Sequence, residues 1–227
     1  MDIDGNLLGL IITYVYVAVI FLISEKLLKN RPSIARKFTH IMVGNIIFLL
    51  PIFSGREVMT FLVACPILIF SFLMTKYSPI KIKNSITSSG HGLGLFYYAI
   101  SWTVLAFLFY DQPYIIAVGI AAMSYGDGFA SLIGGKFGKH KYKIFGETKS
   151  FEGSLAMFLV LVAMLYLCLG YYAYIIGGYP LNILNLYVVL IISALATVVE
   201  GISPKGTDNL TVCFVAVILY ILLIGLV

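Results

Sequence analysis

Long apolar stretches alternate with short polar ones along the whole of this chain of 227 residues. Eight of the apolar runs approach the roughly 20 residues that an α-helix needs to cross about 30 Å of hydrocarbon. They cover residues 5–24, 36–54, 57–75, 92–110, 113–133, 151–172, 182–200 and 209–227. The runs are continuously apolar and lack the alternation of a membrane β-barrel. The pattern predicts an all-α, polytopic membrane protein with about eight transmembrane helices.

Composition supports the same class. Hydrophobic residues make up 61% of the chain and charged residues 11%, against roughly 45–50% and about 25% in soluble proteins. No internal repeat, linker or low-complexity segment separates the apolar runs, so we expect one transmembrane domain over residues 1–227.

The basic residues predict the orientation of the chain in the membrane. The segments that follow the first, third, fifth and seventh apolar runs hold fourteen lysines and arginines, whereas those after the second, fourth and sixth hold only Arg56. Positively charged loops face the cytoplasm. Both termini are therefore expected outside and the polar clusters described below inside. Nucleic acid is not an expected partner, because the positive charge is divided among short loops.

Two polar clusters belong to the second and fifth apolar runs. Arg36 and His40, with Lys37 between them, would share one face of a helix at a spacing of four residues. They would bind an anion together, or they would mark topology and extend to lipid headgroups. Asp127 follows Gly126 near the end of the fifth run, where a carboxylate needs a cation or a water-filled cavity. It is a hard ligand suited to magnesium, or one member of a structural pair with a lysine.

A glycine-rich segment follows, with Gly134, Lys136 and Gly138. It is not a Walker A motif, because Ile133 stands where that motif has its first glycine and His140 where it has Ser or Thr. A glycine-rich turn flanked by lysines can still bind phosphate through its backbone amides.

Two more clusters occupy the start of the sixth run and the junction of the last two. Ser150 is expected to cap a helix by accepting a hydrogen bond from Gly153. The free N–H groups of this helix end, beside Lys149, would then bind an anion. The alternative is an ordinary helix start at the membrane interface. Glu200 ends one apolar run, and Asp208 and Asn209 open the next. These oxygens, with Asp127, would bind one or two magnesium ions, although Asp208 would equally serve as a plain helix cap.

These blocks together resemble the polyprenol kinase group of membrane lipid kinases, which includes dolichol kinase, phytol kinase and the CTP-dependent diacylglycerol kinase. The matching motifs are Arg36-Lys37-x-x-His40, Gly126-Asp127 with Gly134-x-Lys136-Phe137-Gly138, Lys149-Ser150-x-Glu152-Gly153-Ser154, and Val199-Glu200 with Asp208-Asn209-Leu210-Thr211. The four blocks occur in the family's order. Cys213 stands where the family often has proline, a difference that concerns helix packing more than chemistry.

The resemblance implies transfer of the γ-phosphate of a nucleotide, usually CTP, to the hydroxyl of a lipid alcohol, with a divalent metal such as Mg²⁺. The acceptor would be a polyprenol, dolichol, phytol-like alcohol or diacylglycerol. The residues expected in catalysis are Asp127, Lys149, Glu200 and Asp208, of which Asp127, Asp208 and Glu200 would hold the metal. Those expected to bind nucleotide or phosphate are Arg36, Lys37, His40, Gly126, Gly134, Lys136, Gly138, Ser150, Gly153 and Asn209.

Two other functions compete with this one. A CDP-lipid synthase would transfer a cytidylyl group from CTP to a lipid phosphate, but the motif that such enzymes carry near their end is absent from residues 200–209. A membrane transporter would also place ionisable residues in its spans. Transporters tend to show internal repeats and broken helices near the middle of the bilayer, whereas the acids here gather toward one membrane face.

Overall fold

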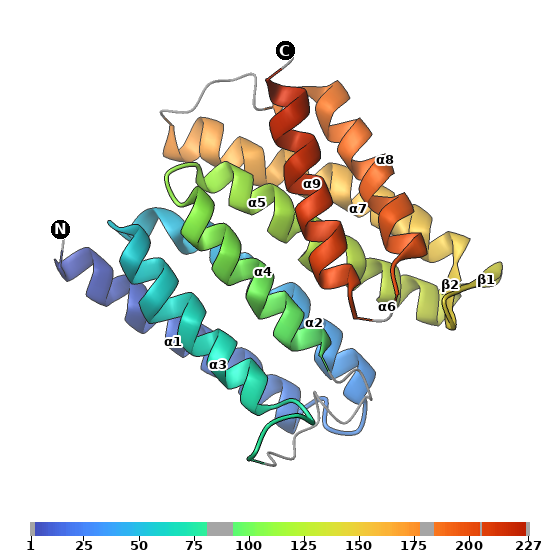
Figure 1. Cartoon of the computed structure of the whole chain (residues 1–227), viewed down its shortest axis with the longest axis horizontal. Helices are drawn as coiled ribbons and strands as arrows, with labels where there is room; N and C mark the ends of the chain where they lie inside the picture. Colours follow the sequence, from blue (N-terminus) through green and yellow to red (C-terminus); the bar gives the residue numbers. More distant parts are fainter. Residues whose placement is uncertain (1–2, 81–92, 178–183, 205, 226–227) are drawn as a thin grey trace. The chain divides into compact units, whose positions relative to one another are not determined.

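The computed structural model describes residues 3–80, 93–177, 184–204 and 206–225 (Figure 1). It is almost entirely helical. The chain forms two compact units, Met1–Asp111 and Gln112–Val227. The expectation of one domain over the whole chain stays a prediction. Lys81, Lys83 and Lys205, which contribute to the predicted orientation, lie outside the described residues.

The first unit contains four apolar helical segments. They are α1 (Ile3–Lys26), α2 (Pro32–Gly44) continued by the 3₁₀-helix η1 (Asn45–Ile52), the π-helix η2 (Val58–Ala64) continued by α3 (Cys65–Leu73), and α4 (Gly94–Phe109). Pro32 occupies the first turn of α2, where its missing N–H is not needed. The helix α1 packs on α2, and α3 packs on α4.

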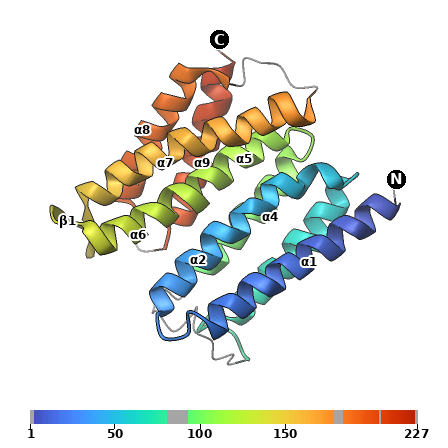
Figure 2. The same ribbon diagram turned by 180° about the vertical axis from the view of Figure 1, so that it is seen from behind.

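The second unit is built around α5. Its elements are α5 (Pro113–Ala121), the π-helix η4 (Ala122–Gly126), α6 (Asp127–Phe137), strands β1 (Lys141–Ile144) and β2 (Glu147–Ser150), α7 (Phe151–Gly170), the π-helix η5 (Tyr171–Ile176), α8 (Leu186–Ile202) and α9 (Asp208–Ile224). Every residue of α5 except Tyr114 is buried. The helices α7 and α9 pack against it (Figure 2).

The predicted fold class, an all-α membrane protein, is confirmed. Within the described residues, four helices are long and apolar enough to cross a membrane: Gly5–Lys26, Pro32–Ile52, Pro113–Phe137 and Phe151–Ile176. Four shorter apolar helices are Val58–Leu73, Gly94–Phe109, Leu186–Ile202 and Asp208–Ile224. Each predicted apolar run thus contains a helix. The number of membrane crossings and the outside location of both termini stay predictions.

A small hairpin interrupts the helices and was not predicted from the sequence. Strands β1 and β2 are antiparallel, with Tyr142 opposite Lys149 and Lys143 opposite Thr148. Phe145 and Gly146 form the turn with φ angles of 49° and 81°. Two successive positive φ angles are typical of a type I′ turn, whose twist matches that of the paired strands.

Candidate active site

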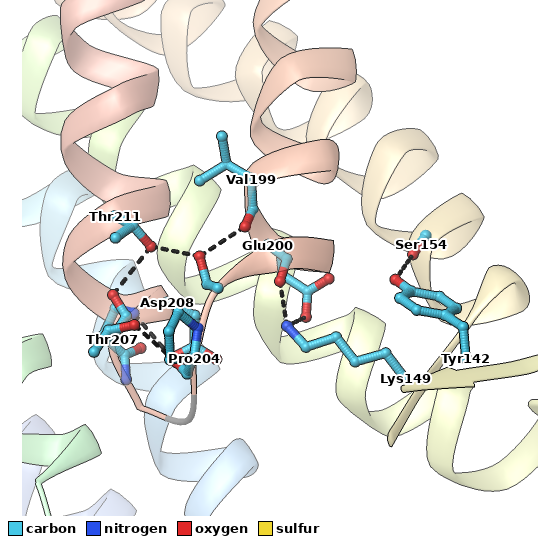
Figure 3. Close-up of polar contacts among 11 residues, drawn as sticks. Tyr142, Lys149, Ser154, Val199, Glu200, Pro204, Thr207, Asp208 and Thr211 are labelled. Atoms are coloured by element: carbon cyan, nitrogen blue, oxygen red, sulfur yellow. Dashed lines mark hydrogen bonds and ion pairs between the residues drawn. The ribbon is translucent and has the colours of Figure 1, made fainter. Parts of the chain in front are cut away.

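A buried ion pair joins the hairpin to the end of α8 (Figure 3). Nζ of Lys149 donates a hydrogen bond to Oε1 of Glu200 over 2.7 Å, and a second one to the main-chain oxygen of Glu200. The two side chains are 11% and 8% exposed. The main-chain oxygen of Glu200 lies in the last turn of α8, where carbonyl groups lack helical partners and favour a cation.

Two further carboxylates act on the same ammonium. Burial is the largest influence on Lys149 and lowers its pKa, but the Glu200 carboxylate and its hydrogen bond, together with Asp208 and Asp127, outweigh it, so that the pKa is raised above 10.5. The charges of three predicted acids, each from a different part of the second unit, therefore act on one lysine, and Glu200 is the one in direct contact with it. The lysine stays charged at neutral pH.

Asp127 directly follows the π-helical turn η4 and begins α6. Its side chain is 3% exposed, and the residues before it are buried too. Gly126 allows α7 to approach, because a Cβ at this position would lie 3.2 Å from Cε of Met157. Single π-helical turns within α-helices are frequent at functional sites. The turn places a carboxylate inside the second unit rather than on its surface.

Hydrogen bonds fix the connection between α8 and α9, at the end of which Asp208 begins α9. Ser203 donates to the main-chain oxygen of Val199 over 2.6 Å and lies 2.7 Å from the Thr211 hydroxyl (Figure 3). The residue that precedes the helix is Thr207, and Asp208 is the first residue of α9. Its carboxylate accepts a hydrogen bond from the N–H of Asn209 over 3.0 Å, so Asp208 does bind a backbone amide at the start of the helix. Its role in holding a metal stays a prediction. Asn209, also predicted at the site, is 3% exposed and next to Asp208.

Ser150 caps α7 as expected. Its Oγ accepts a hydrogen bond from the N–H of Gly153 over 3.1 Å. The expected free N–H groups at this helix end are only partly present, however, because the N–H of Phe151 donates to the main-chain oxygen of His140. The helix dipole still favours negative charge near Lys149.

The expected glycine-rich phosphate turn is not formed. Gly134 and Lys136 lie within α6, and Gly138 is the residue that ends it. A Cβ on Gly134 would lie 2.9 Å from the Ser150 Oγ, and one on Gly153 would lie 2.8 Å from the main-chain oxygen of Ala130. The glycines let α6 and α7 pack closely. The helix persists because the apolar run continues through residues 129–133, and nothing forces a turn before Gly138. Phosphate binding by these glycines and by Lys136 stays a prediction.

The remaining predicted residues lie in the first unit, on α2. Lys37 and His40 are buried, and Nε of Arg36 is buried without a hydrogen-bond partner among the described residues. The Tyr98 hydroxyl donates to the main-chain oxygen of His40 over 3.0 Å, and the two rings are 4.2 Å apart. Tyr98 also lines an apolar cavity of about 20 Å³ with Trp102. That this motif shares a site with Asp127 and Lys149 stays a prediction.

The predicted acids could bind magnesium only together with other ligands. Among the described residues, no group of three or more His, Cys, Asp or Glu side chains is arranged to hold a metal ion. Magnesium, however, is usually bound by one or two carboxylates together with substrate phosphates and water. One or two of the predicted acids Asp127, Glu200 and Asp208 would fit that arrangement, in which the nucleotide completes the coordination.

Two contacts that position the site were missed in the sequence. The Tyr142 hydroxyl lies 3.0 Å from the Ser154 hydroxyl (Figure 3). It would also lie 3.0 Å from a Cβ on Gly201. Glu152 accepts hydrogen bonds from the main-chain N–H and the ring of His140, the ring contact being 2.7 Å. Glu152 and Ser154 belong to the motif that begins at Lys149, but Tyr142 lies in the hairpin and His140 directly before it, and the apolar pattern does not reveal this segment.

The chain is similar in sequence to several curated proteins. The chain is 30% identical over 217 residues to the phytol kinase of Synechocystis sp., and the alignment covers 90% of this chain and 85% of that protein. The chain belongs to the phytol kinase family. It is also 30% identical over 206 residues to the probable chloroplastic phytol kinase of Triticum aestivum, covering 85% and 68% of the two chains. Identity to phytol kinase 1 of Arabidopsis thaliana is 32% over 198 residues, covering 79% and 63%.

Membership of the phytol kinase family confirms the resemblance to the polyprenol kinase group and makes the chain a phosphotransferase with an alcohol group as acceptor. No family model matches the chain. No solved structure matches it either. The roles of individual residues therefore depend on their geometry.

Proposed function

We propose that the chain is a lipid kinase that transfers the γ-phosphate of CTP to the hydroxyl of an isoprenoid alcohol in the membrane, at a site on the cytoplasmic side. The observation that carries this proposal is the cluster formed by the buried Lys149–Glu200 ion pair and the charges of Asp127 and Asp208, which act on the same ammonium. Phosphoryl transfer depends on positioning and on charges that stabilise the phosphate oxygens, and this cluster supplies both. The phytol kinases among the relatives support an isoprenoid acceptor.

Lys149 binds the phosphates in this proposal. Two of the three N–H bonds of its ammonium point to Glu200, which leaves one for a phosphate oxygen. Because its pKa is raised, Lys149 keeps its charge and does not accept a proton at neutral pH. Its task is to offset the negative charge of the transferred group.

The carboxylates divide the other tasks. Asp208 would hold Mg²⁺ with the nucleotide phosphates, and the bound ion would neutralise phosphate charge. Glu200 is paired with Lys149, and we assign to Asp127, which is buried at the start of α6, the orientation of the acceptor hydroxyl and the acceptance of its proton. The alcohol oxygen forms a bond to the γ-phosphorus as the bond to the β-phosphate oxygen breaks. CDP leaves and the lipid monophosphate remains.

Arg36, Lys37 and His40 would bind nucleotide or phosphate in this proposal, because together they match the basic motif of the family. Nε of Arg36 is buried without a hydrogen-bond partner among the described residues, which suits a guanidinium that binds an anion.

Replacing Asp127 tests the proposal. We expect Asp127→Asn to fold and to lose at least about 100-fold in activity, because it removes the group that accepts the proton. Asp111→Asn is the matched control, since Asp111 is exposed and forms an ion pair with Arg56 in the first unit. It should retain activity within about twofold, as surface substitutions usually do. Full activity of a folded Asp127→Asn protein would remove Asp127 from the mechanism.

A further inference from the structure

Phe145 at the tip of the hairpin has an unusual conformation. Its φ angle is 49°, and it is the only non-glycine residue with positive φ in the described part of the chain. Its side chain is 73% exposed. Glycine or asparagine would form this turn without strain, and Phe gains nothing there from burial in the protein. A strained and exposed aromatic side chain points to a contact outside the protein.

The hairpin has two chemically different faces. Tyr142 and Lys149, which are paired across the strands, lie on the face that contacts the candidate active site. Lys141 and Lys143 lie on the opposite face and are exposed. Neither forms an ion pair among the described residues. The outer face is therefore positively charged.

The acids near the hairpin do not neutralise this face. Glu147 pairs with Ile144 on the inner side, and Glu152 is bonded to His140. Two more lysines, Lys136 and Lys139, are exposed in the segment that leads into the hairpin. The basic residues thus extend from the end of α6 to the turn.

The hairpin connects two helices that are long enough to cross a membrane. Pro113–Phe137 ends just before it and Phe151–Ile176 begins just after it. Figures 1 and 2 show the hairpin beside the ends of α6 and α7. Phe137 and Phe151 are exposed where these helices meet it. If these two helices cross the bilayer, the basic face and Phe145 come to lie at the level of the lipid headgroups.

We propose that the outer face of the hairpin docks on anionic phospholipid headgroups of the membrane that holds the chain. Phe145 inserts at the interface, where aromatic rings are favoured, and Lys141 and Lys143 bind headgroup phosphates. The lipid surface thereby holds the strand that carries Lys149 against α8. This contact does not depend on the proposed reaction, and its test does not use activity.

The test places a fluorescent probe at the tip. The full chain with Phe145→Trp is reconstituted in vesicles of phosphatidylcholine, with and without phosphatidylglycerol, containing lipids brominated near the headgroup. The chain has one natural tryptophan, Trp102, which is buried and supplies the baseline to be subtracted. We expect bromine quenching of the added tryptophan to be several-fold stronger in the anionic vesicles. Quenching that is absent, or equal in the two vesicles, would overturn the proposal.

Two sets of variants separate the lipid contact from folding. The first set combines Lys141→Ser and Lys143→Ser with Phe145→Trp. It should abolish the difference in bromine quenching between anionic and neutral vesicles, because each lysine contributes about fivefold to binding at an anionic surface. The second variant, Phe145→Asn, relieves the strained turn, so its midpoint of thermal unfolding should not lie below that of the natural protein. Hydrogen exchange of residues 141–149 should slow in anionic vesicles in the natural protein and not in Phe145→Asn. Equal slowing in both proteins would overturn the role of Phe145.

Discussion

The ammonium of Lys149 lies 2.7 Å from a carboxylate oxygen of Glu200, a residue 51 positions further along the chain. Both side chains are nearly buried, at 11% and 8% exposed. Removing two ions from water costs several kcal/mol for each, which only good geometry and further hydrogen bonds offset. Here the main-chain oxygen of Glu200 and two other acids provide that support. The pair holds the hairpin against α8 and fixes the position of the Lys149 ammonium.

Removing one member of this pair should destabilise the protein. Lys149→Met or Glu200→Gln alone leaves a buried charge without its partner, and we expect a loss of about 3–5 kcal/mol in the free energy of unfolding. The double variant, Lys149→Met with Glu200→Met, should recover most of that loss. Denaturant unfolding in detergent, followed by circular dichroism, measures all three.

Lys141→Met is the matched control, because Lys141 is exposed on the same hairpin. Its stability should change by less than about 0.5 kcal/mol. Single variants at Lys149 and Glu200 that are no less stable than this control would show that the pair contributes nothing to the fold.

The pair also predicts a pH dependence of stability. The pKa of Lys149 is raised in the folded state above its ordinary value of 10.5. Its contribution is therefore fully present below about pH 10.5 and is lost as the pH rises through the higher folded value. The thermal midpoint of the natural protein should fall toward that of Lys149→Met above pH 10.5. A difference between the two midpoints that stays constant through alkaline pH would contradict the raised pKa.

The helices could be predicted from the sequence because their cause is local. A run of about 20 apolar residues satisfies its own backbone only as a helix in hydrocarbon. The cap formed by Ser150 and Gly153 was predictable for the same reason, since both partners lie within one turn. A shared site for Asp127, Glu200 and Asp208 was expected from motifs at one membrane face and a family resemblance, whereas the contact between Lys149 and Glu200 depends on helix packing.

The hairpin and the glycines show where local reasoning fails. Residues 141–150 carry neither an apolar run nor an Asn-Gly or Asp-Gly turn, and Phe145 is a poor residue for positive φ. Gly134 was expected in a phosphate-binding turn because glycine-rich segments often form one. In the structure, Gly134 instead lets α6 approach α7 closely. The need for a small residue at this position comes from α7, which follows later in the chain, so the segment around Gly134 does not reveal it.

Close packing of α6 on α7 gives a sharp prediction for glycine substitutions. Gly153→Ala would bring a methyl group to 2.8 Å from the main-chain oxygen of Ala130, and Gly134→Ala one to 2.9 Å from the Ser150 Oγ. Each should lower the free energy of unfolding by about 1–3 kcal/mol. Gly135→Ala is the control on the same helix, because nothing lies within 4 Å of the added methyl group. It should be neutral or slightly stabilising. Equal effects at Gly134 and Gly135 would contradict the packing.

The hydrogen bond between Tyr142 and Ser154 should be measurable as a coupling. Tyr142→Phe and Ser154→Ala each remove one side of a 3.0 Å contact and should each destabilise the protein by about 1 kcal/mol. Because they remove the same bond, the double variant should be less destabilised than the sum of the two. A double-mutant cycle on unfolding free energies measures this coupling. Strict additivity would mean that the bond does not anchor the hairpin.

The most direct test of the central claim is a phosphoryl-transfer assay on the purified, folded protein with Mg²⁺, γ-labelled CTP or ATP, and isoprenoid alcohols or diacylglycerol. We predict that label moves from CTP into an organic-soluble isoprenyl monophosphate and that CDP is released. Transfer from ATP or to diacylglycerol alone would contradict the proposed donor or acceptor. A CDP-lipid formed with release of pyrophosphate, or no labelled lipid from any combination, would contradict the kinase activity itself.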